Sequence, residues 1–184
     1  MTLIALGSNL PDEGADARST VLAALDRLGD ALGEGLVASR LFRTPAFPAG
    51  SGPDFVNAAC RCDTFLQADE ILAVLHRIEA EAGRVRDRRW GPRVLDLDLI
   101  ALGDVVLPDP ATARHWMDLP HDRQMREAPD QLVVPHPRLQ DRSFVLEPLM
   151  DIAAEWRHPL TGLTVAQMAA ARPAAERAEV VALD

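Results

Sequence analysis

The N-terminal half of the chain alternates between short apolar runs and longer amphipathic stretches. The apolar run at residues 2–6 ends in a Gly-Ser-Asn turn, which is typical of a buried strand. Apolar positions then recur at three- and four-residue steps over 21–32 and again over 71–78, which predicts two helices. Residues 36–43 and 55–63 have the pattern of strands, with a loop rich in proline and glycine between them.

Residues 94–101 contain an alternation of apolar and acidic positions, which predicts a strand with one charged face. The apolar positions are Leu95, Leu97 and Leu99, and the acidic pair is Asp96 and Asp98. The resulting order of strand, helix, strand, strand, helix, strand predicts a ferredoxin-like βαββαβ core of the α+β class. Both helices should then cover the leucine side of an antiparallel sheet.

The C-terminal half carries weaker patterns. A turn after residue 102 leads to a further strand near Val105, and residues 132–134 could return beside it as an extra hairpin. Residues 108–131 are polar and weakly periodic, which predicts a surface insertion that could hold a short helix. The alanine-rich tail from Thr164 has a helical composition. At this length we expect a single domain over residues 1–184.

Composition narrows the possible functions. The formal net charge of -9 argues against a general nucleic-acid binder, because cationic side chains supply most of the affinity for phosphate. The chain has no stretch of about 18 apolar residues that could span a bilayer, and its start lacks the pattern of an export signal, so we expect a cytoplasmic protein. Cys60 and Cys62 stand two residues apart on an expected strand, so we expect buried reduced thiols.

The positive charge is concentrated in one short segment before the acidic strand. The arginines concerned are Arg84, Arg86, Arg88, Arg89 and Arg93. Paired carboxylates with neighbouring arginines suit a magnesium polyphosphate, because Mg²⁺ binds through one or two carboxylates plus substrate phosphates, and arginine forks bind phosphate oxygens. The alternative for Asp96 and Asp98 is a solvated strand face without a ligand.

Aromatic residues stand close to these charges. Trp90 follows the arginines directly, and Phe144 and His136 lie in later segments that also contain arginine. Aromatic faces beside cations can hold a flat heterocycle. Plain packing explains Trp90 equally well, and Phe144 and His136, each taken alone, are more often a core phenylalanine and a surface histidine. The Gly7–Ser8 turn has no lysine at the spacing of a phosphate-binding P-loop.

Seven segments in order resemble the 6-hydroxymethyl-7,8-dihydropterin pyrophosphokinase family. They are residues 5–9, 43–45, 53–59, 83–86, 89–98, 135–138 and 144–146. The resemblance runs from Leu3 to about Ala153, and the segment from Trp90 to Asp98 is its most specific part. It implies transfer of diphosphate from ATP to the hydroxymethyl group of the pterin, with release of AMP, in folate biosynthesis.

The resemblance also implies site residues and ligands. The residues implied in catalysis are Arg84, Arg93, Asp96 and Asp98, and the two aspartates would hold two Mg²⁺ ions. The implied ATP contacts are Glu79, Arg86, Arg89, Trp90, Leu99, His136 and Arg142. The implied pterin contacts are Thr44, Pro45, Phe47, Phe55, Asn57, Trp90 and Phe144. The expected partners are these two small substrates alone, and the expected state is a monomer.

Some positions depart from the family pattern. Asp87 stands where a basic residue is frequent, and Gln131, Val133 and Pro137 replace polar or aromatic residues of other members. The sequence therefore does not decide which phosphate and nucleotide contacts these positions make. The role of the 108–131 insertion is also undecided: it could be a lid over ATP, a partner surface or neither.

Two other functions are consistent with parts of the pattern. A nucleotidyltransferase also pairs a Gly-Ser turn with an Asp-x-Asp strand, but its turn lies shortly before the carboxylates, whereas Ser8 and Asp96 stand far apart in this sequence. A ferredoxin-like binding module that senses a nucleotide or a folate would bind both ligands without turnover. An assay of AMP release separates the binding module from the enzyme.

Overall fold

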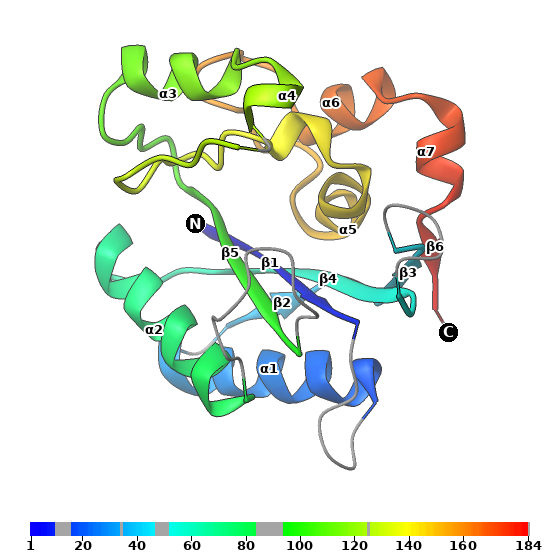
Figure 1. Cartoon of the computed structure of the whole chain (residues 1–184). Helices are drawn as coiled ribbons and strands as arrows, with labels where there is room; N and C mark the ends of the chain where they lie inside the picture. The colour runs from blue at the N-terminus through cyan, green and yellow to red at the C-terminus, as the bar shows by residue number, and fades with distance from the viewer. Residues whose placement is uncertain (10–15, 34, 47–51, 84–93, 125, 184) are drawn as a thin grey trace.

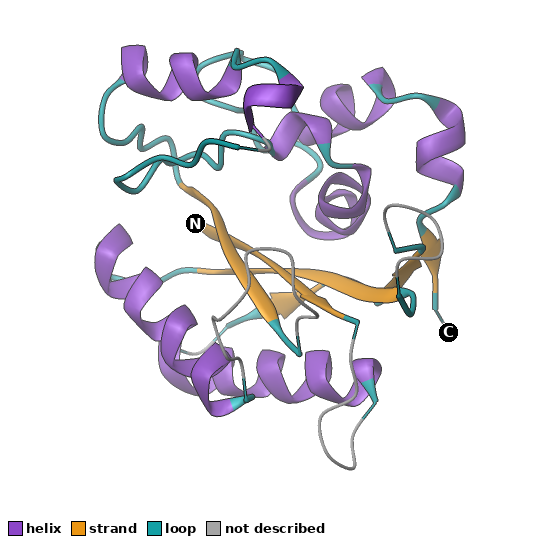
Figure 2. Ribbon diagram, in the orientation of Figure 1, coloured by secondary structure: helices purple, strands orange, loops and turns teal. Residues whose placement is uncertain are grey.

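The computed structural model describes residues 1–9, 16–33, 35–46, 52–83, 94–124 and 126–183. Figures 1 and 2 show a sheet with one pair of helices on one face and the C-terminal helices on the other. The sheet lies between two helical layers, so the chain buries apolar side chains on both sides of it.

The sheet contains strands from both ends of the chain. Their bounds are β1 Thr2–Ser8, β2 Val37–Ala38, β3 Phe42–Thr44, β4 Phe55–Cys62, β5 Asp96–Leu102 and β6 Val181–Ala182. The order is β5-β1-β4-β3-β6, with β2 also paired to β4, and all these pairs are antiparallel. With α1 and α2 as crossovers, β1 to β5 form the expected ferredoxin-like arrangement, which confirms the predicted fold class.

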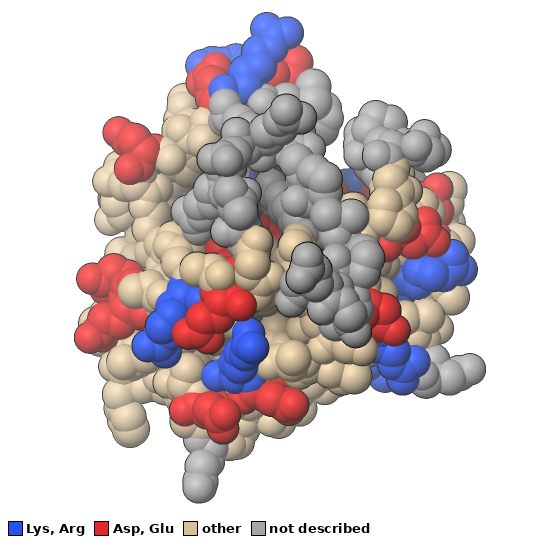
Figure 3. Space-filling model, turned by 60° about the horizontal axis from the view of Figure 1, so that its bottom comes forward, with Lys and Arg blue, Asp and Glu red and all other residues tan. Residues whose placement is uncertain are grey.

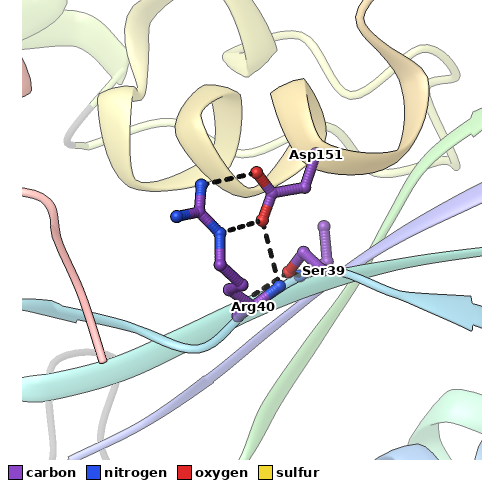
Figure 4. Close-up of polar contacts among 4 residues, drawn as sticks. Ser39, Arg40 and Asp151 are labelled. Atoms are coloured by element: carbon purple, nitrogen blue, oxygen red, sulfur yellow. Dashed lines mark hydrogen bonds and ion pairs between the residues drawn. The ribbon is translucent and has the colours of Figure 1, made fainter. Parts of the chain in front are cut away.

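The strand expected over residues 36–43 is broken into β2 and β3. Ala38 pairs with Cys60, whereas Phe42 pairs with Asn57, so the segment between them carries one extra residue. The Ser39 hydroxyl accepts a hydrogen bond of 2.9 Å from the Ala59 amide at this bulge. Figure 4 shows Ser39 beside Arg40. The prediction of one continuous strand over residues 36–43 was therefore wrong. At the bulge, the Ser39 hydroxyl replaces a backbone carbonyl as the acceptor of a ladder hydrogen bond.

The helices α1 (Ala17–Leu32) and α2 (Ala68–Glu81) cover the leucine face of the sheet, as predicted. The main apolar side chains of this layer are Ile4, Leu6, Val21, Leu28, Ile71, Leu75, Ile78, Leu95, Leu97 and Leu99. Each such side chain contributes about 1.5–3 kcal/mol by burial, so this layer is a major source of stability. Cys60 and Cys62 are free thiols in the same layer, and burial raises the pKa of Cys60 to about 12.

The outer surface of this layer is mixed in charge. Figure 3 shows acidic and basic side chains interspersed over this side of the molecule. Arg27 and Asp30 of α1 and Arg77 and Glu81 of α2 line a shallow hollow between the two helices. Opposite charges of this kind screen one another, and surface pairs stabilise a fold only weakly.

The opposite face of the sheet is covered by helices from the C-terminal half. These are α5 (Ser143–Ala153) and α6 (Val165–Ala171), which pack on Leu3, Ala5, Ala59, Ile100 and Ala101. The Asp96 side of β5 therefore does not remain a charged face along its whole length. It becomes apolar from Ile100 onward, beneath α5.

The remaining elements surround α5. The predicted C-terminal hairpin is reduced to one antiparallel bridge between Leu107 and Val134. The 108–131 segment contains two short helices, α3 (Pro110–Met117) and α4 (His121–Gln124), and a 3-10 turn, η1 (Leu139–Asp141), precedes α5. The tail is helical in α6 and α7 (Ala174–Ala178), as predicted, but it ends in the unpredicted β6. None of the described helices is long and apolar enough to cross a membrane.

Candidate active site

Asp96 and Asp98 lie on the face of β5 that α5 covers further along. In the register of the sheet, Asp96 is opposite Gly7 and Asp98 is opposite Ala5 on β1. Ala5 is buried in the α5–α6 layer, whereas Gly7 has no side chain and is only partly buried beside Asp96. The Asp98 side chain is partly exposed, at 36%. The alternation that predicted a shared face for the two aspartates is thus present in the strand.

Arg142 contacts this carboxylate pair from the start of α5. Its Nη1 donates to Asp98 Oδ2 at 3.3 Å, and the guanidinium carbon lies 5.7 Å from the centre of the Phe144 ring. Arg142 occupies the N-cap position of α5 and makes no capping bond with its side chain. Its side chain reaches the strand instead, and one cation thus contacts both Asp98 and the aromatic ring.

His136 lies beside the same carboxylate. Its backbone amide donates to the Ile100 carbonyl at 2.8 Å, and its Nδ1 accepts from the Arg138 amide at 3.1 Å. Burial lowers the pKa of His136 to about 4; Asp98 opposes the shift, and Arg142 adds to it. The imidazole is therefore neutral at pH 7, and since Nδ1 accepts, Nε2 carries the proton and can act as a donor.

Glu79 contacts β5 from the other side of the sheet, and the Leu99 side chain of β5 points to that same side. Glu79 on α2 is 2% exposed, and its Oε1 accepts a 2.8 Å hydrogen bond from the amide of Leu97, between the two aspartates. Leu99 is buried in the α1–α2 layer. The structure therefore places Glu79 against the backbone of the acidic strand, and it does not bring the Leu99 side chain to the aspartate face.

A second polar group lies across the sheet on the same face. Asn57 Nδ2 donates to Thr44 Oγ1 at 2.8 Å, and both residues are buried. Gly7 stands between Asn57 and Asp96 in the register, and a Cβ on Gly7 would lie 3.0 Å from Asn57 Oδ1. Phe55 pairs with Thr44 at the end of β3, and Pro45 follows. Residue 7 thus has to lack a side chain for the Asn57 amide to keep its position beside Thr44.

Among the described residues of this region, Phe144 is an exposed aromatic. It lies in the first turn of α5 and is 41% exposed. An aromatic side chain with this exposure can contact a flat ligand through its ring. The arrangement combines two carboxylates, a cation, a neutral imidazole, a buried amide and an aromatic ring on one side of the sheet.

The model of the 7,8-dihydro-6-hydroxymethylpterin-pyrophosphokinase (HPPK) family matches residues 3–154. The chain belongs to the HPPK family. It is similar to the 2-amino-4-hydroxy-6-hydroxymethyldihydropteridine pyrophosphokinase of Pseudomonas aeruginosa, with 40% identity over 157 residues, which cover 85% of this chain and 82% of that protein. The Synechocystis protein of the same name is 38% identical over 78% of this chain and 67% of its own length.

The fold is also that of solved HPPK domains. The wild-type HPPK-DHPS of Plasmodium falciparum matches with a TM-score of 0.63 over 92% of this chain and 44% of that longer chain. The sequence identity is 13%, so this likeness concerns the fold alone. The folic acid synthesis protein fol1 of Pneumocystis carinii is 32% identical over 163 residues, which are 19% of its length. The HPPK unit of this chain thus also matches part of larger proteins.

Several predicted site residues of this HPPK lie outside the described residues. They are Phe47, Arg84, Arg86, Arg89, Trp90 and Arg93. The roles expected for them remain predictions. The described residues contain no cluster of three or more His, Cys, Asp or Glu side chains suited to a metal. The metal site expected at Asp96 and Asp98 stays a prediction.

One contact near the site was not predicted from the sequence. The Ser8 hydroxyl at the end of β1 donates a hydrogen bond of 2.5 Å to the Val94 carbonyl, just before β5. It ties the Gly-Ser turn to the start of the acidic strand. Ser8 lies in one of the family-like segments, but a contact to a residue so distant in sequence leaves no local pattern by which it could be found.

Proposed function

We propose that this HPPK transfers a diphosphate group from ATP to the hydroxymethyl group of 6-hydroxymethyl-7,8-dihydropterin and releases AMP, a step of folate biosynthesis. Membership of the HPPK family supports the reaction. The single structural observation that carries the proposal is the acidic pair of β5 on the same sheet face as the Asn57–Thr44 pair. One surface can then bind both the phosphates of ATP and the polar edge of the pterin ring.

Asp96 and Asp98 suit Mg²⁺ by their chemistry. Their oxygens are hard donors, and Mg²⁺ commonly takes one or two carboxylates plus phosphate oxygens. Two bound ions would neutralise phosphate charge and lower the pKa of the pterin hydroxyl. The aspartates would hold and space these charges, and the absence of a side chain at Gly7 leaves room for the phosphates above that end of β1.

The residues around the acidic pair bind and orient the nucleotide. Arg142 already lies at the Asp98 carboxylate and can donate to a phosphate oxygen from the same position. His136 is neutral and can donate from Nε2 without adding charge. The further residues proposed for ATP and catalysis are Glu79, Arg84, Arg86, Arg89, Trp90, Arg93 and the backbone of Leu99, whose side chain is buried in the α1–α2 layer. Among them, Arg84 and Arg93 stabilise charge that develops during transfer.

The pterin ring binds between the sheet and α5. Asn57 can hydrogen-bond the polar edge of the ring, since an amide offers both a donor and an acceptor, and Thr44 fixes its orientation. Phe144 stacks on the ring face. Pro45, Phe47, Phe55 and Trp90 complete the proposed pocket. We expect the chain to work as a monomer with one domain.

The test is AMP release from ATP and the reduced hydroxymethylpterin in the presence of Mg²⁺. The wild type should release AMP, and chelation of the metal should stop the reaction. Asp96→Asn and Asp98→Asn should each lower turnover by about a hundredfold or more, because each removes a charge that a metal needs. Asp104→Asn, an exposed carboxylate beyond β5, is the control and should keep normal turnover.

Two outcomes would overturn the proposal. Tight binding of both ligands without AMP release would indicate a sensor module. Normal turnover of Asp96→Asn and Asp98→Asn at saturating Mg²⁺ would remove the metal assignment.

A further inference from the structure

The C-terminal strand β6 pairs with β3, the strand that ends at Thr44. The two strands are antiparallel, with Ala182 opposite Phe42. The Leu183 amide donates a 2.8 Å hydrogen bond to the Leu41 carbonyl. Since β3 has only three residues and its other edge pairs with β4, β6 supplies the second half of its ladder.

The same segment also contacts the helix that carries Phe144. Arg177 on α7 donates from Nε to Glu147 Oε1 on α5 at 2.7 Å. Glu147 lies one helical turn after Phe144, on the first half of α5. Figure 1 shows α7 and β6 passing from the level of α5 down to β3. The segment therefore bridges the two walls proposed for the pterin pocket.

Little apolar burial holds this segment in place. α7 has no buried residue, and both residues of β6 are exposed. Leu183 is partly buried against the α1–α2 core, while the Arg177–Glu147 pair is partly exposed. The main apolar layers are built without residues 174–182. A change in this segment can therefore alter β3 without unfolding the chain.

We propose that residues 174–183 form a positioning strap for the pterin pocket, which holds β3 and the start of α5 in a fixed relation. The strap rests on the function proposed above. A three-residue strand that pairs along one edge only would fray, and Thr44 stands at its end. Displacement of Thr44 moves the hydroxyl that orients the Asn57 amide. The strap consequently acts on pterin binding through β3, which carries Thr44 and is separated from the Asp98 strand β5 by β4 and β1.

The test compares Leu183→Pro with Leu183→Ala. Proline removes the amide donor to Leu41, whereas alanine removes the same side chain and keeps that donor. The dissociation constant of the pterin is measured by calorimetry with Mg²⁺ and a non-hydrolysable ATP analogue present. The dissociation constant of Leu183→Pro should be about 3- to 10-fold higher than that of Leu183→Ala, as expected for one lost hydrogen bond. The analogue affinity and the turnover at saturating pterin should stay unchanged.

A second variant, Arg177→Gln, breaks the contact to α5 without touching the strand. It should raise the KM for the pterin while kcat stays constant. This variant tests the strap even if Leu183→Pro does not fold. Equal pterin affinity in all variants, or equal loss of affinity for both ligands, would overturn the strap. Wild-type protein that releases no AMP overturns the proposed function itself, whereas an active wild type with unaffected variants overturns the strap alone.

Discussion

Asp151 on α5 accepts three hydrogen bonds from Arg40, which lies between β2 and β3 (Figure 4). Its Oδ2 accepts from the Arg40 backbone amide at 3.0 Å and from Nε at 2.9 Å, and its Oδ1 accepts from Nη2 at 2.8 Å. The guanidinium carbon also lies 5.3 Å from the centre of the Phe42 ring. This contact joins the bulged strand to the helix that begins beside Phe144.

Asp151→Asn should lower the free energy of unfolding at pH 7, because it removes the charge that the Arg40 fork binds. Hydrogen bonding by Arg40 lowers the pKa of Asp151 below its ordinary value. The stabilisation is therefore present above the unfolded pKa of about 3.9 and is lost as the pH falls through the lower folded pKa. Urea unfolding at pH 7 and pH 3 measures the difference.

The control for this prediction is Asp26→Asn, which removes an exposed carboxylate from α1. It should leave stability nearly unchanged at both pH values. If Asp151→Asn behaved like this control, the Arg40 contact would contribute nothing to folding.

Phe144→Ala should weaken pterin binding by about tenfold, since stacking of a flat ring on an aromatic side chain contributes about 1–3 kcal/mol. Its stability should change little, because the ring is 41% exposed. Phe65→Ala is the matched control, since Phe65 is a fully exposed phenylalanine in the loop before α2. Calorimetric titration of the pterin distinguishes them, and equal affinity of the two variants would exclude Phe144 from the pocket.

Gly7→Ala should reduce pterin affinity while the protein still folds. The new Cβ would lie 3.0 Å from Asn57 Oδ1, so the amide must move away from Thr44. The loss should be about tenfold, the value of one buried polar contact. Gly29→Ala in α1 meets no atom within 4 Å, and it should raise stability by about 0.5–1 kcal/mol. Pterin affinity of Gly7→Ala equal to that of Gly29→Ala would contradict this account.

The stability of the protein should fall as the pH decreases from about 6.5 to about 4. Burial lowers the pKa of His158 to about 4, and the nearby Arg114 adds to the shift. The unfolded state, with a histidine pKa of about 6.5, then binds more protons than the folded state in this range, so acid favours unfolding. His136 contributes in the same direction.

His158→Asn isolates the contribution of His158. The asparagine Oδ1 can replace Nδ1 as acceptor of the Leu160 amide, a contact of 3.1 Å in the wild type, without titrating. Urea unfolding from pH 7.5 to pH 4.5 should therefore show a shallower loss of stability than in the wild type. An identical pH profile would show that His158 does not titrate on unfolding.

Local periodicity in the sequence determined much of the core. The alternation at residues 96–99 places both aspartates on one face of β5, because a strand repeats every two residues. The three- and four-residue steps in α1 and α2 likewise specify a helical face that packs on the leucine side. The family-like segments led to the same reaction class that the comparisons support.

Only the tertiary structure decided how distant segments meet. The bulge at Ser39, the pairing of β6 with β3, and the contact of Arg142 with Asp98 each join residues that no local repeat relates. The second helical layer over Ile100 also depends on where α5 packs. Periodicity records which face of an element is buried, but it carries no information about which partner buries it. That choice depends on the packing and pairing of the whole chain.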